Sequence, residues 1–182
     1  MIGLGSNLGE RSANIRKALT LLEGSGHFCL EKRSLLYESR PVGPTQPDFL
    51  NGVVEGKTDL SPETFLSLLK KTEKELGRSE GLRWGPRVVD LDLLSYGESI
   101  VDTPSLTVPH PRLEEREFVL VPLSEIAPSW RHPKLHKSAL ELLEALYSDA
   151  HHPASRPVET MEPLGQAARR DDRFRPDDGG AS

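Results

Sequence analysis

The sequence has one cysteine, lacks long apolar runs and carries fewer basic than acidic residues. Its single cysteine, Cys29, cannot form an internal disulfide, so a reducing, cytoplasmic setting is the default expectation. No window approaches 18 consecutive apolar residues, and residues 1–5 lack the basic segment and apolar run of a signal peptide. The net charge of −5 argues against bulk nucleic-acid binding. We therefore expect no nucleic acid and no membrane as a partner, and no obligate protein partner is evident.

Several signatures of common nucleotide and metal enzymes are also missing. The chain has no G-x-x-x-x-G-K-[ST] segment, so phosphates are not held by a P-loop. Gly3, Gly5 and Gly9 give only a near miss for the dinucleotide fingerprint. The six histidines show no zinc-ligand spacing, and no serine lies in a nucleophile elbow. These absences exclude several classes of enzyme without identifying one.

The hydrophobic periodicity predicts alternating strands and helices. Strand patterns cover residues 2–5, 28–37, 50–57, 88–94 and 100–101, and an apolar run covers 118–126. Helical spacing follows residues 15–22 and 139–147, and a further helix begins after Ser61 and stops at Gly77. The order and the short connections predict an α+β fold, a sandwich of helices on a largely antiparallel sheet.

The C-terminal part of the sequence differs from the rest. Beyond Ser148, proline, glycine, aspartate and arginine accumulate and the apolar periodicity disappears. Such a segment cannot bury enough surface to offset the entropy lost on ordering. We therefore expect a catalytic domain over residues 1–147 and a disordered tail over 148–182.

Asp90 and Asp92 are the strongest chemical signal. They lie two residues apart in a run of valines and leucines, so in a strand they project from one face, roughly 6.6–6.8 Å apart along the chain. Two carboxylates on one face can share a pair of hard cations. The alternative is a solvated face, or a structural network in which arginines pair with the acids, and the two aspartates alone do not decide between these.

The segment directly upstream favours a polyphosphate ligand. Arg83 and Arg87 place two guanidinium groups just before the acids, and guanidinium is suited to phosphate oxygens. Trp84 could stack on a flat heterocycle, although a lone tryptophan more often fills a core. Cations for phosphates beside carboxylates for Mg²⁺ point to a nucleotide polyphosphate.

Residues 83–94, RWGPRVVDLDLL, closely match the signature of the 6-hydroxymethyl-7,8-dihydropterin pyrophosphokinases. Other segments of that family agree in order and spacing, namely GSNLG at 5–9, RPVGPTQPDFLN at 40–51, LGR at 76–78, TVPHPRLEEREFVLVPL at 107–123 and EIAP at 125–128. The resemblance covers about residues 1–147. It implies a ferredoxin-like three-layer α/β/α sandwich. It also implies transfer of pyrophosphate from ATP to the pterin hydroxymethyl group, giving the pterin diphosphate and AMP, in tetrahydrofolate biosynthesis.

The resemblance also implies roles for individual residues. Asp90 and Asp92 would hold two Mg²⁺ ions and, with Arg87, form the catalytic group. The ATP-binding residues would be Lys70, Glu73, Arg78, Arg87, Leu93, Thr107, His110 and Arg116. The pterin-binding residues would be Val42, Phe49, Asn51, Trp84 and Phe118. Positioning and electrostatics suffice for such a transfer, so no covalent nucleophile is expected.

Each role has a simpler alternative. Lys70 and Glu73 could form an ordinary ion pair on a helix surface, and His110 could merely cap a turn. Phe49 and Phe118 are core aromatics by default, and Arg116 could be a solvated partner of nearby glutamates. For the whole chain, the alternatives are a pterin- or nucleotide-binding module without catalysis, a metal-dependent phosphodiesterase, and a structural interaction domain.

Overall fold

The computed structural model describes residues 1–41, 45–78, 85–148 and 156–159. The strands are β1 (Ile2–Ser6), β2 (Phe28–Arg33), β3 (Leu36–Ser39), β4 (Phe49–Thr58), β5 (Asp90–Leu93), β6 (Val101–Asp102), β7 (Thr107–Val108) and β8 (Arg156–Glu159). The helices are α1 (Arg11–Gly24), α2 (Pro62–Glu75), α3 (Glu117–Ile126) and α4 (Ala139–Ser148), with a short 3₁₀ helix, η1, at Leu113–Glu115. The predicted α+β class is confirmed.

The main sheet is antiparallel in every pair that the described residues form. Its order is β5-β1-β4-β3-β8, with β2 pairing with the far half of β4, and β6 and β7 form a separate small hairpin. The short strand β1 lies between β5 and β4, because Gly5 pairs with Asn51 of β4 on one side and with Asp90 of β5 on the other. The register therefore brings three distant segments of the sequence side by side.

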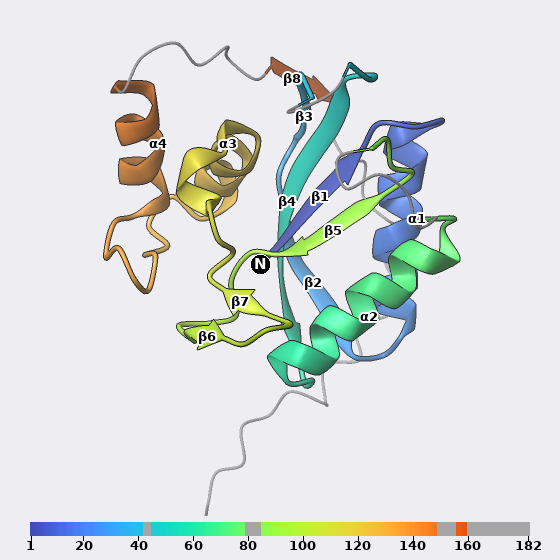
Figure 1. Cartoon of the computed structure of the whole chain (residues 1–182), viewed down its shortest axis with the longest axis horizontal. Helices are drawn as coiled ribbons and strands as arrows, with labels where there is room; N and C mark the ends of the chain where they lie inside the picture. The colour runs from blue at the N-terminus through green and yellow to red at the C-terminus, as the bar shows by residue number, and fades with distance from the viewer. Residues whose placement is uncertain (42–44, 79–84, 149–155, 160–182) are drawn as a thin grey trace, which may run out of the picture.

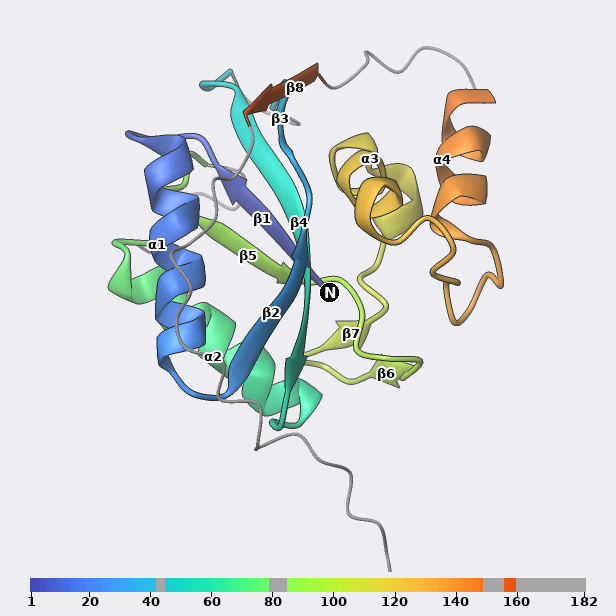
Figure 2. The same ribbon diagram turned by 180° about the vertical axis from the view of Figure 1, so that it is seen from behind.

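Helices cover both faces of this sheet, which gives three layers (Figures 1 and 2). Helices α1 and α2 lie on one face, where Leu19, Leu69 and Leu91 belong to one buried core. Helix α3 packs on the other face against β4, and α4 packs on α3, with Leu120 in a second core. Burial of these apolar side chains is the main stabilising contribution to the fold.

Helix α2 begins and ends where the sequence predicts. The hydroxyl of Ser61 accepts a hydrogen bond from the backbone N–H of Thr64 at 3.3 Å, and Pro62 follows in the first turn. Gly77 adopts a φ of +94°, which a residue with a side chain rarely takes. These signals fix the helix that carries Lys70 and Glu73.

Two predicted strands are shorter than expected. The segment over 28–37 is divided into β2 and β3, because the Ser34 hydroxyl accepts a hydrogen bond from the Val53 N–H at 3.0 Å, where a strand carbonyl would otherwise serve. The segment over 88–94 forms a strand only from Asp90, because the Val88 carbonyl accepts a hydrogen bond from the Ser6 hydroxyl at 2.6 Å instead of a strand N–H.

The predicted tail contains one described segment. Residues Arg156–Glu159 form β8, which pairs with β3 at the edge of the sheet, a strand that the prediction of disorder over 148–182 did not include. The rest of that segment beyond Ser148 lies outside the described residues, and the boundary at residue 147 stays a prediction. Within the described part of the chain, no helix has the length and apolar character to cross a membrane.

Candidate active site

The two aspartates project from β5 onto the same face, as their spacing predicts. Asp90 and Asp92 are partly exposed, whereas Leu91 and Leu93 alternate with them and are buried in the core beneath α1 and α2. The side chains of Asp90 and Asp92 are 20% and 33% exposed. Both carboxylates are therefore open to solvent on one side and backed by apolar packing on the other.

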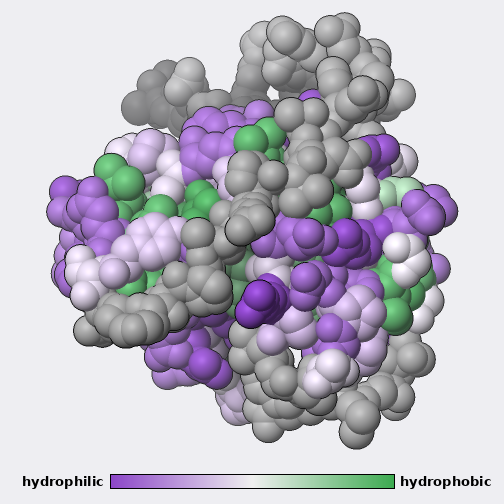
Figure 3. Space-filling model, turned by 90° about the horizontal axis from the view of Figure 1, so that it is seen from above, coloured by the Kyte–Doolittle hydropathy of each residue, from purple (hydrophilic) through white to green (hydrophobic). Residues whose placement is uncertain are grey.

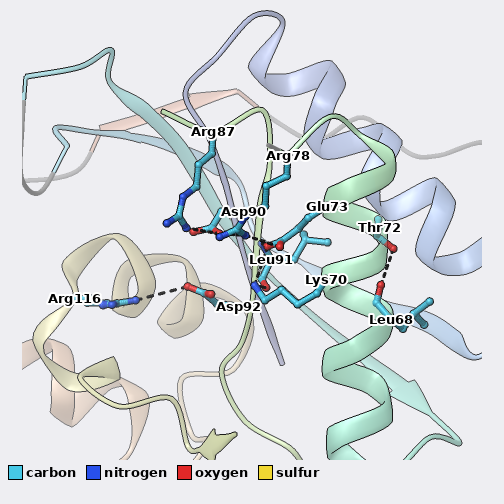
Figure 4. Close-up of polar contacts among 10 residues, drawn as sticks. All are labelled: Leu68, Lys70, Thr72, Glu73, Arg78, Arg87, Asp90, Leu91, Asp92 and Arg116. Atoms are coloured by element: carbon cyan, nitrogen blue, oxygen red, sulfur yellow. Dashed lines mark hydrogen bonds and ion pairs between the residues drawn. The ribbon is translucent and has the colours of Figure 1, made fainter. Parts of the chain in front are cut away.

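Glu73 lies behind the aspartates as a buried acid. Its carboxylate accepts hydrogen bonds from the backbone N–H of Leu91 at 2.7 Å and from Lys70 Nζ at 2.9 Å. It also forms an ion pair with Arg78 (Figure 4). Burial raises the pKa of Glu73, and Lys70 and the Leu91 hydrogen bond work against that rise. Glu73 is fully buried, so its carboxylate serves other protein groups rather than a solvent-exposed ligand.

Asp90 is the point where two arginines meet. Its Oδ1 accepts hydrogen bonds from Arg87 Nη1 at 2.6 Å and from Arg78 Nη1 at 2.8 Å. Burial opposes ionisation of Asp90, but the charges of Arg87, Lys70 and Arg78 outweigh it, and the pKa of this carboxyl lies below its ordinary value. Asp90 is therefore ionised at neutral pH. In Figure 4 the side chains of Arg87 and Arg78 converge on Asp90.

Asp92 has a looser environment. Arg116 Nη1 lies 3.7 Å from its Oδ2, and the Arg116 guanidinium also lies over the ring of Phe118, 5.7 Å from the centroid. His110 is close by, and its backbone N–H donates to the Leu94 carbonyl at 2.9 Å. Burial lowers the pKa of His110, and the charge of Asp92 partly opposes this, so the imidazole is mostly neutral at neutral pH.

Two of the expected pterin residues, Phe49 and Asn51, lie in β4, on the other side of β1 from the aspartates. The amide of Asn51 donates to the Ser39 hydroxyl at 2.7 Å, and Phe49 is half-buried at the start of β4. A side chain at Gly5 would meet Asn51 Oδ1 at 3.3 Å, with Phe49 Cδ1 and Asp90 Cβ both at 3.7 Å. The glycine therefore keeps the surface between Asn51 and Asp90 free of a side chain, which would crowd Asn51 Oδ1.

The structure does not gather every expected residue equally. The side chain of Leu93 is buried in the core, so only its backbone is placed to contact a ligand. Thr107 lies in β7, with its hydroxyl 3.4 Å from Asp102 Oδ1. Val42, Arg83 and Trp84 lie outside the described residues. Seen from above, the end of the molecule where β1 ends and β4 and β5 begin carries many hydrophilic residues (Figure 3).

Two residues next to the site were not assigned a role from the sequence. Asn7 and Ser6 bind the segment that leads into β5, through Arg87 and Val88. The segment at residues 5–9 was noted only for its resemblance to the family. A buried asparagine directly after a strand could have signalled a structural hydrogen-bonding role, because an amide is rarely buried without partners.

The donor set suits Mg²⁺ held together with a phosphate ligand. Among the described residues, no group of three or more histidine, cysteine, aspartate or glutamate side chains could hold a metal ion. Mg²⁺ is usually bound by one or two carboxylates together with substrate phosphates and water, which is what Asp90 and Asp92 on one exposed face can provide. The fit therefore depends on a polyphosphate as a further ligand.

A sequence profile of a known family matches most of the chain. The sequence profile described as 7,8-dihydro-6-hydroxymethylpterin-pyrophosphokinase (HPPK) matches residues 1–128. That range contains both aspartates, all the arginines discussed above and Asn51. The chain belongs to this family of pyrophosphokinases.

Several curated relatives are named as this pyrophosphokinase, and the match to two of them covers about three quarters of their length. The 2-amino-4-hydroxy-6-hydroxymethyldihydropteridine pyrophosphokinase of Synechocystis is 42% identical over 144 residues, which is 79% of this chain and 74% of the relative. The Bacillus subtilis protein of that name is 48% identical over 126 residues, 69% of this chain and 75% of the relative. A mitochondrial folate synthesis bifunctional protein of Arabidopsis thaliana is 48% identical over 127 residues, but the match covers only 23% of it.

Solved structures share the fold at low sequence identity. The Plasmodium falciparum HPPK-DHPS wild type with pteroate has a TM-score of 0.66 at 14% identity, over 81% of this chain and 44% of that one. The A437G form with pteroate has a TM-score of 0.64 at 15% identity. The chain spans less than half of these structures, so the likeness concerns the fold of one part of them.

Proposed function

We propose that this pyrophosphokinase transfers pyrophosphate from Mg²⁺-ATP to the hydroxymethyl group of 6-hydroxymethyl-7,8-dihydropterin, with AMP as the second product, in tetrahydrofolate biosynthesis. The transfer itself follows from membership of the family. The dependence on Mg²⁺, the expected number of two ions and the residue assignments are the proposal. The observation that supports it is that the ionised Asp90 lies beside the partly exposed Asp92 on one face of β5. Arg78 and Arg87 pair with Asp90, and Arg116 pairs with Asp92.

Asp90 and Asp92 would hold the metal. When bound, Mg²⁺ neutralises charge on the phosphates and so favours attack at phosphorus. Arg87 and Arg78 would face the same phosphates, since both already bind an anionic oxygen of Asp90. The residues of the chain thus supply fixed charge rather than a nucleophile.

The pterin would lie on the β4 side of Gly5. Asn51 would offer an amide at the floor of this region, and Phe49 would offer a ring at its border. Phe118, whose ring lies under the Arg116 guanidinium, would reach the pterin from α3. A Cβ at Gly5 would lie 3.3 Å from Asn51 Oδ1 and 3.7 Å from Asp90 Cβ, so the glycine keeps the surface between these two residues free of a side chain. A hydroxymethyl group placed over Gly5 would point toward phosphates bound through the metal and the arginines, which is the orientation an in-line attack needs.

His110 and Thr107 would line the nucleotide side, together with Arg116. Because burial lowers the pKa of His110, its neutral imidazole can offer a hydrogen bond without adding positive charge. Lys70 and Glu73 would act through Arg78 and β5, since both bind those elements already. Leu93 would contribute through its backbone.

The test is a direct assay of AMP release from Mg²⁺, ATP and the reduced pterin. The wild type should release AMP only when the pterin is present, and chelation of the metal should stop the reaction until Mg²⁺ is restored. Asp90→Asn and Asp92→Asn should each lower the rate by at least about a hundredfold, the order of effect seen when a fixed electrostatic group is lost. Circular dichroism should show that both variants remain folded.

The alternatives give different results in the same assay. A binding module would hold ATP and pterin without forming AMP. A phosphodiesterase would cleave its substrate without pterin. Full activity of both aspartate variants would refute the metal assignment even if the wild type is active.

A further inference from the structure

Asn7 connects the segments that lead into the two strands on either side of β1. It follows β1 directly, and it is only 2% exposed. Its side chain reaches Arg87, ahead of β5, and Gln46 and Pro47, ahead of β4. Within the described residues, one buried amide therefore contacts both segments.

On the β5 side, Asn7 holds the backbone of Arg87 by two hydrogen bonds. The Arg87 N–H donates to Asn7 Oδ1 at 2.6 Å, and the Asn7 N–H donates to the Arg87 carbonyl at 3.1 Å. The Ser6 hydroxyl donates to the next carbonyl, that of Val88. These bonds set where the Arg87 side chain begins, and that side chain binds Asp90 at 2.6 Å.

On the β4 side, the same amide holds the loop before Phe49. Asn7 Nδ2 donates to Gln46 Oε1 at 3.0 Å and to the Pro47 carbonyl at 3.2 Å. Phe49 and Asn51, the residues expected to contact the pterin, follow within a few positions. The donors and the acceptor of one side chain are thus divided between the two halves of the site.

We propose that Asn7 is a positioning residue that fixes the pterin-side loop relative to Arg87, and so sets the separation between the two substrates. This inference rests on the proposed function, because it assigns the two segments to pterin and phosphate. A buried amide with all of its hydrogen bonds made is a rigid link, since breaking either side leaves a buried polar group unpaired.

Arg11 provides a second attachment for the loop before Phe49, which does not depend on Asn7. Arg11 Nη1 donates to the Asp48 carbonyl at 2.8 Å and pairs with Glu38 at 2.8 Å. The loop therefore stays attached to α1 and β3 when Asn7 is changed. What is lost without Asn7 is the connection of the loop to Arg87.

The test uses Asn7→Asp as the selective variant. Aspartate keeps an oxygen that can accept from the Arg87 N–H, but it loses both donors and sets a second oxygen against the Pro47 carbonyl, which can only accept a hydrogen bond. We expect the KM for pterin to rise about tenfold, because a tenfold change corresponds to the free energy of one or two lost hydrogen bonds. The KM for ATP should stay within about twofold of the wild-type value. Gln46→Ala removes one acceptor on the same side and should raise the pterin KM in the same direction.

Asn7→Ala removes the side-chain bonds to both segments and leaves only the backbone bond from the residue 7 N–H to the Arg87 carbonyl, so kcat should fall and both KM values should rise. Asn14→Ala is the matched control, because the Asn14 amide donates at 2.9 Å to the Leu8 carbonyl and bonds neither Gln46, Pro47 nor Arg87. The kinetic constants of this control should match those of the wild type. If Asn7→Ala does not fold, Asn7→Asp and Gln46→Ala still decide the question.

Equal increases in both KM values for Asn7→Asp would overturn the proposal, because they would indicate a general loss of structure. Kinetics of Asn7→Asp indistinguishable from those of Asn14→Ala would overturn it as well. A double variant, Asn7→Asp with Gln46→Ala, should show less than the sum of the single effects if the two residues act through one link. A wild type that releases no AMP would instead refute the proposed function.

Discussion

Replacement of Glu73 is the sharpest test of how the site is held together. Glu73→Ala removes the acceptor of the Leu91 N–H and the partner of both Lys70 and Arg78. Breaking a buried ion pair by removal of one partner typically costs about 3–5 kcal/mol. After the substitution, the charge of Lys70 is still partly solvated, since this side chain is 39% exposed, and the charge of Arg78 is still paired with Asp90. We therefore expect a loss in the free energy of unfolding at the lower end of this range, about 3 kcal/mol.

The conservative variant separates charge from hydrogen bonding. Glu73→Gln keeps an oxygen for the Leu91 N–H and should cost about 1–2 kcal/mol. Glu75→Ala is the control on the same helix, because Glu75 pairs with Lys71 at 3.8 Å and is 48% exposed, which should contribute less than about 0.5 kcal/mol.

The measurement is the free energy of unfolding from urea titrations, with the m-value compared among the four proteins. The expected order of stability is wild type and Glu75→Ala, then Glu73→Gln, then Glu73→Ala. If Glu73→Ala were as stable as Glu75→Ala, the buried carboxylate would not support β5, and the reasoning from its contacts would be wrong.

Two further predictions concern stability away from the aspartates. Burial, a hydrogen bond to Glu125 and the charge of that carboxylate raise the pKa of Tyr37 from 10.0 to about 12 in the folded protein. The protonated phenol therefore stabilises the folded state below pH 10, and this stabilisation is lost as the pH rises toward 12. Urea midpoints measured from pH 8 to 11 should therefore fall less steeply for Tyr37→Phe than for the wild type, and parallel curves would contradict this. Gly56→Ala should destabilise the protein by about 1–3 kcal/mol, because the added carbon would lie 2.5 Å from both the Cys29 carbonyl and the Phe28 ring. Gly24→Ala, where nothing lies within 4 Å, is its control, and equal urea midpoints for the two variants would refute the packing argument.

The α+β class and the strand bearing the aspartates were predictable from local patterns. Alternation in residues 88–94 puts Asp90 and Asp92 on one face whatever the rest of the chain does, and the Ser61 and Gly77 signals define α2 in the same local way. The division between β2 and β3 was not predictable, because it depends on the Ser34 hydroxyl meeting Val53, a residue of another strand.

The burial of Glu73 could not be predicted from the sequence pattern either. Its spacing from Lys70 fits an ordinary surface ion pair, and that pair is present. Its burial arises because β5 is at the edge of the sheet, so the Leu91 N–H needs an acceptor from α2. Asn7 depends in the same way on two segments far along the chain. The roles of all the site residues in substrate binding stay predictions.

The arginines around Asp90 have a counter-ion before any ligand arrives. A triphosphate that reached Arg78 and Arg87 would thus trade one anion for another, and the metal would take over the carboxylate that they release. The net affinity for the nucleotide would then be smaller than its new charge contacts alone would give, because the contacts between Asp90 and the arginines are given up. Such an exchange would keep the nucleotide from being bound too tightly for the product to leave after each turnover.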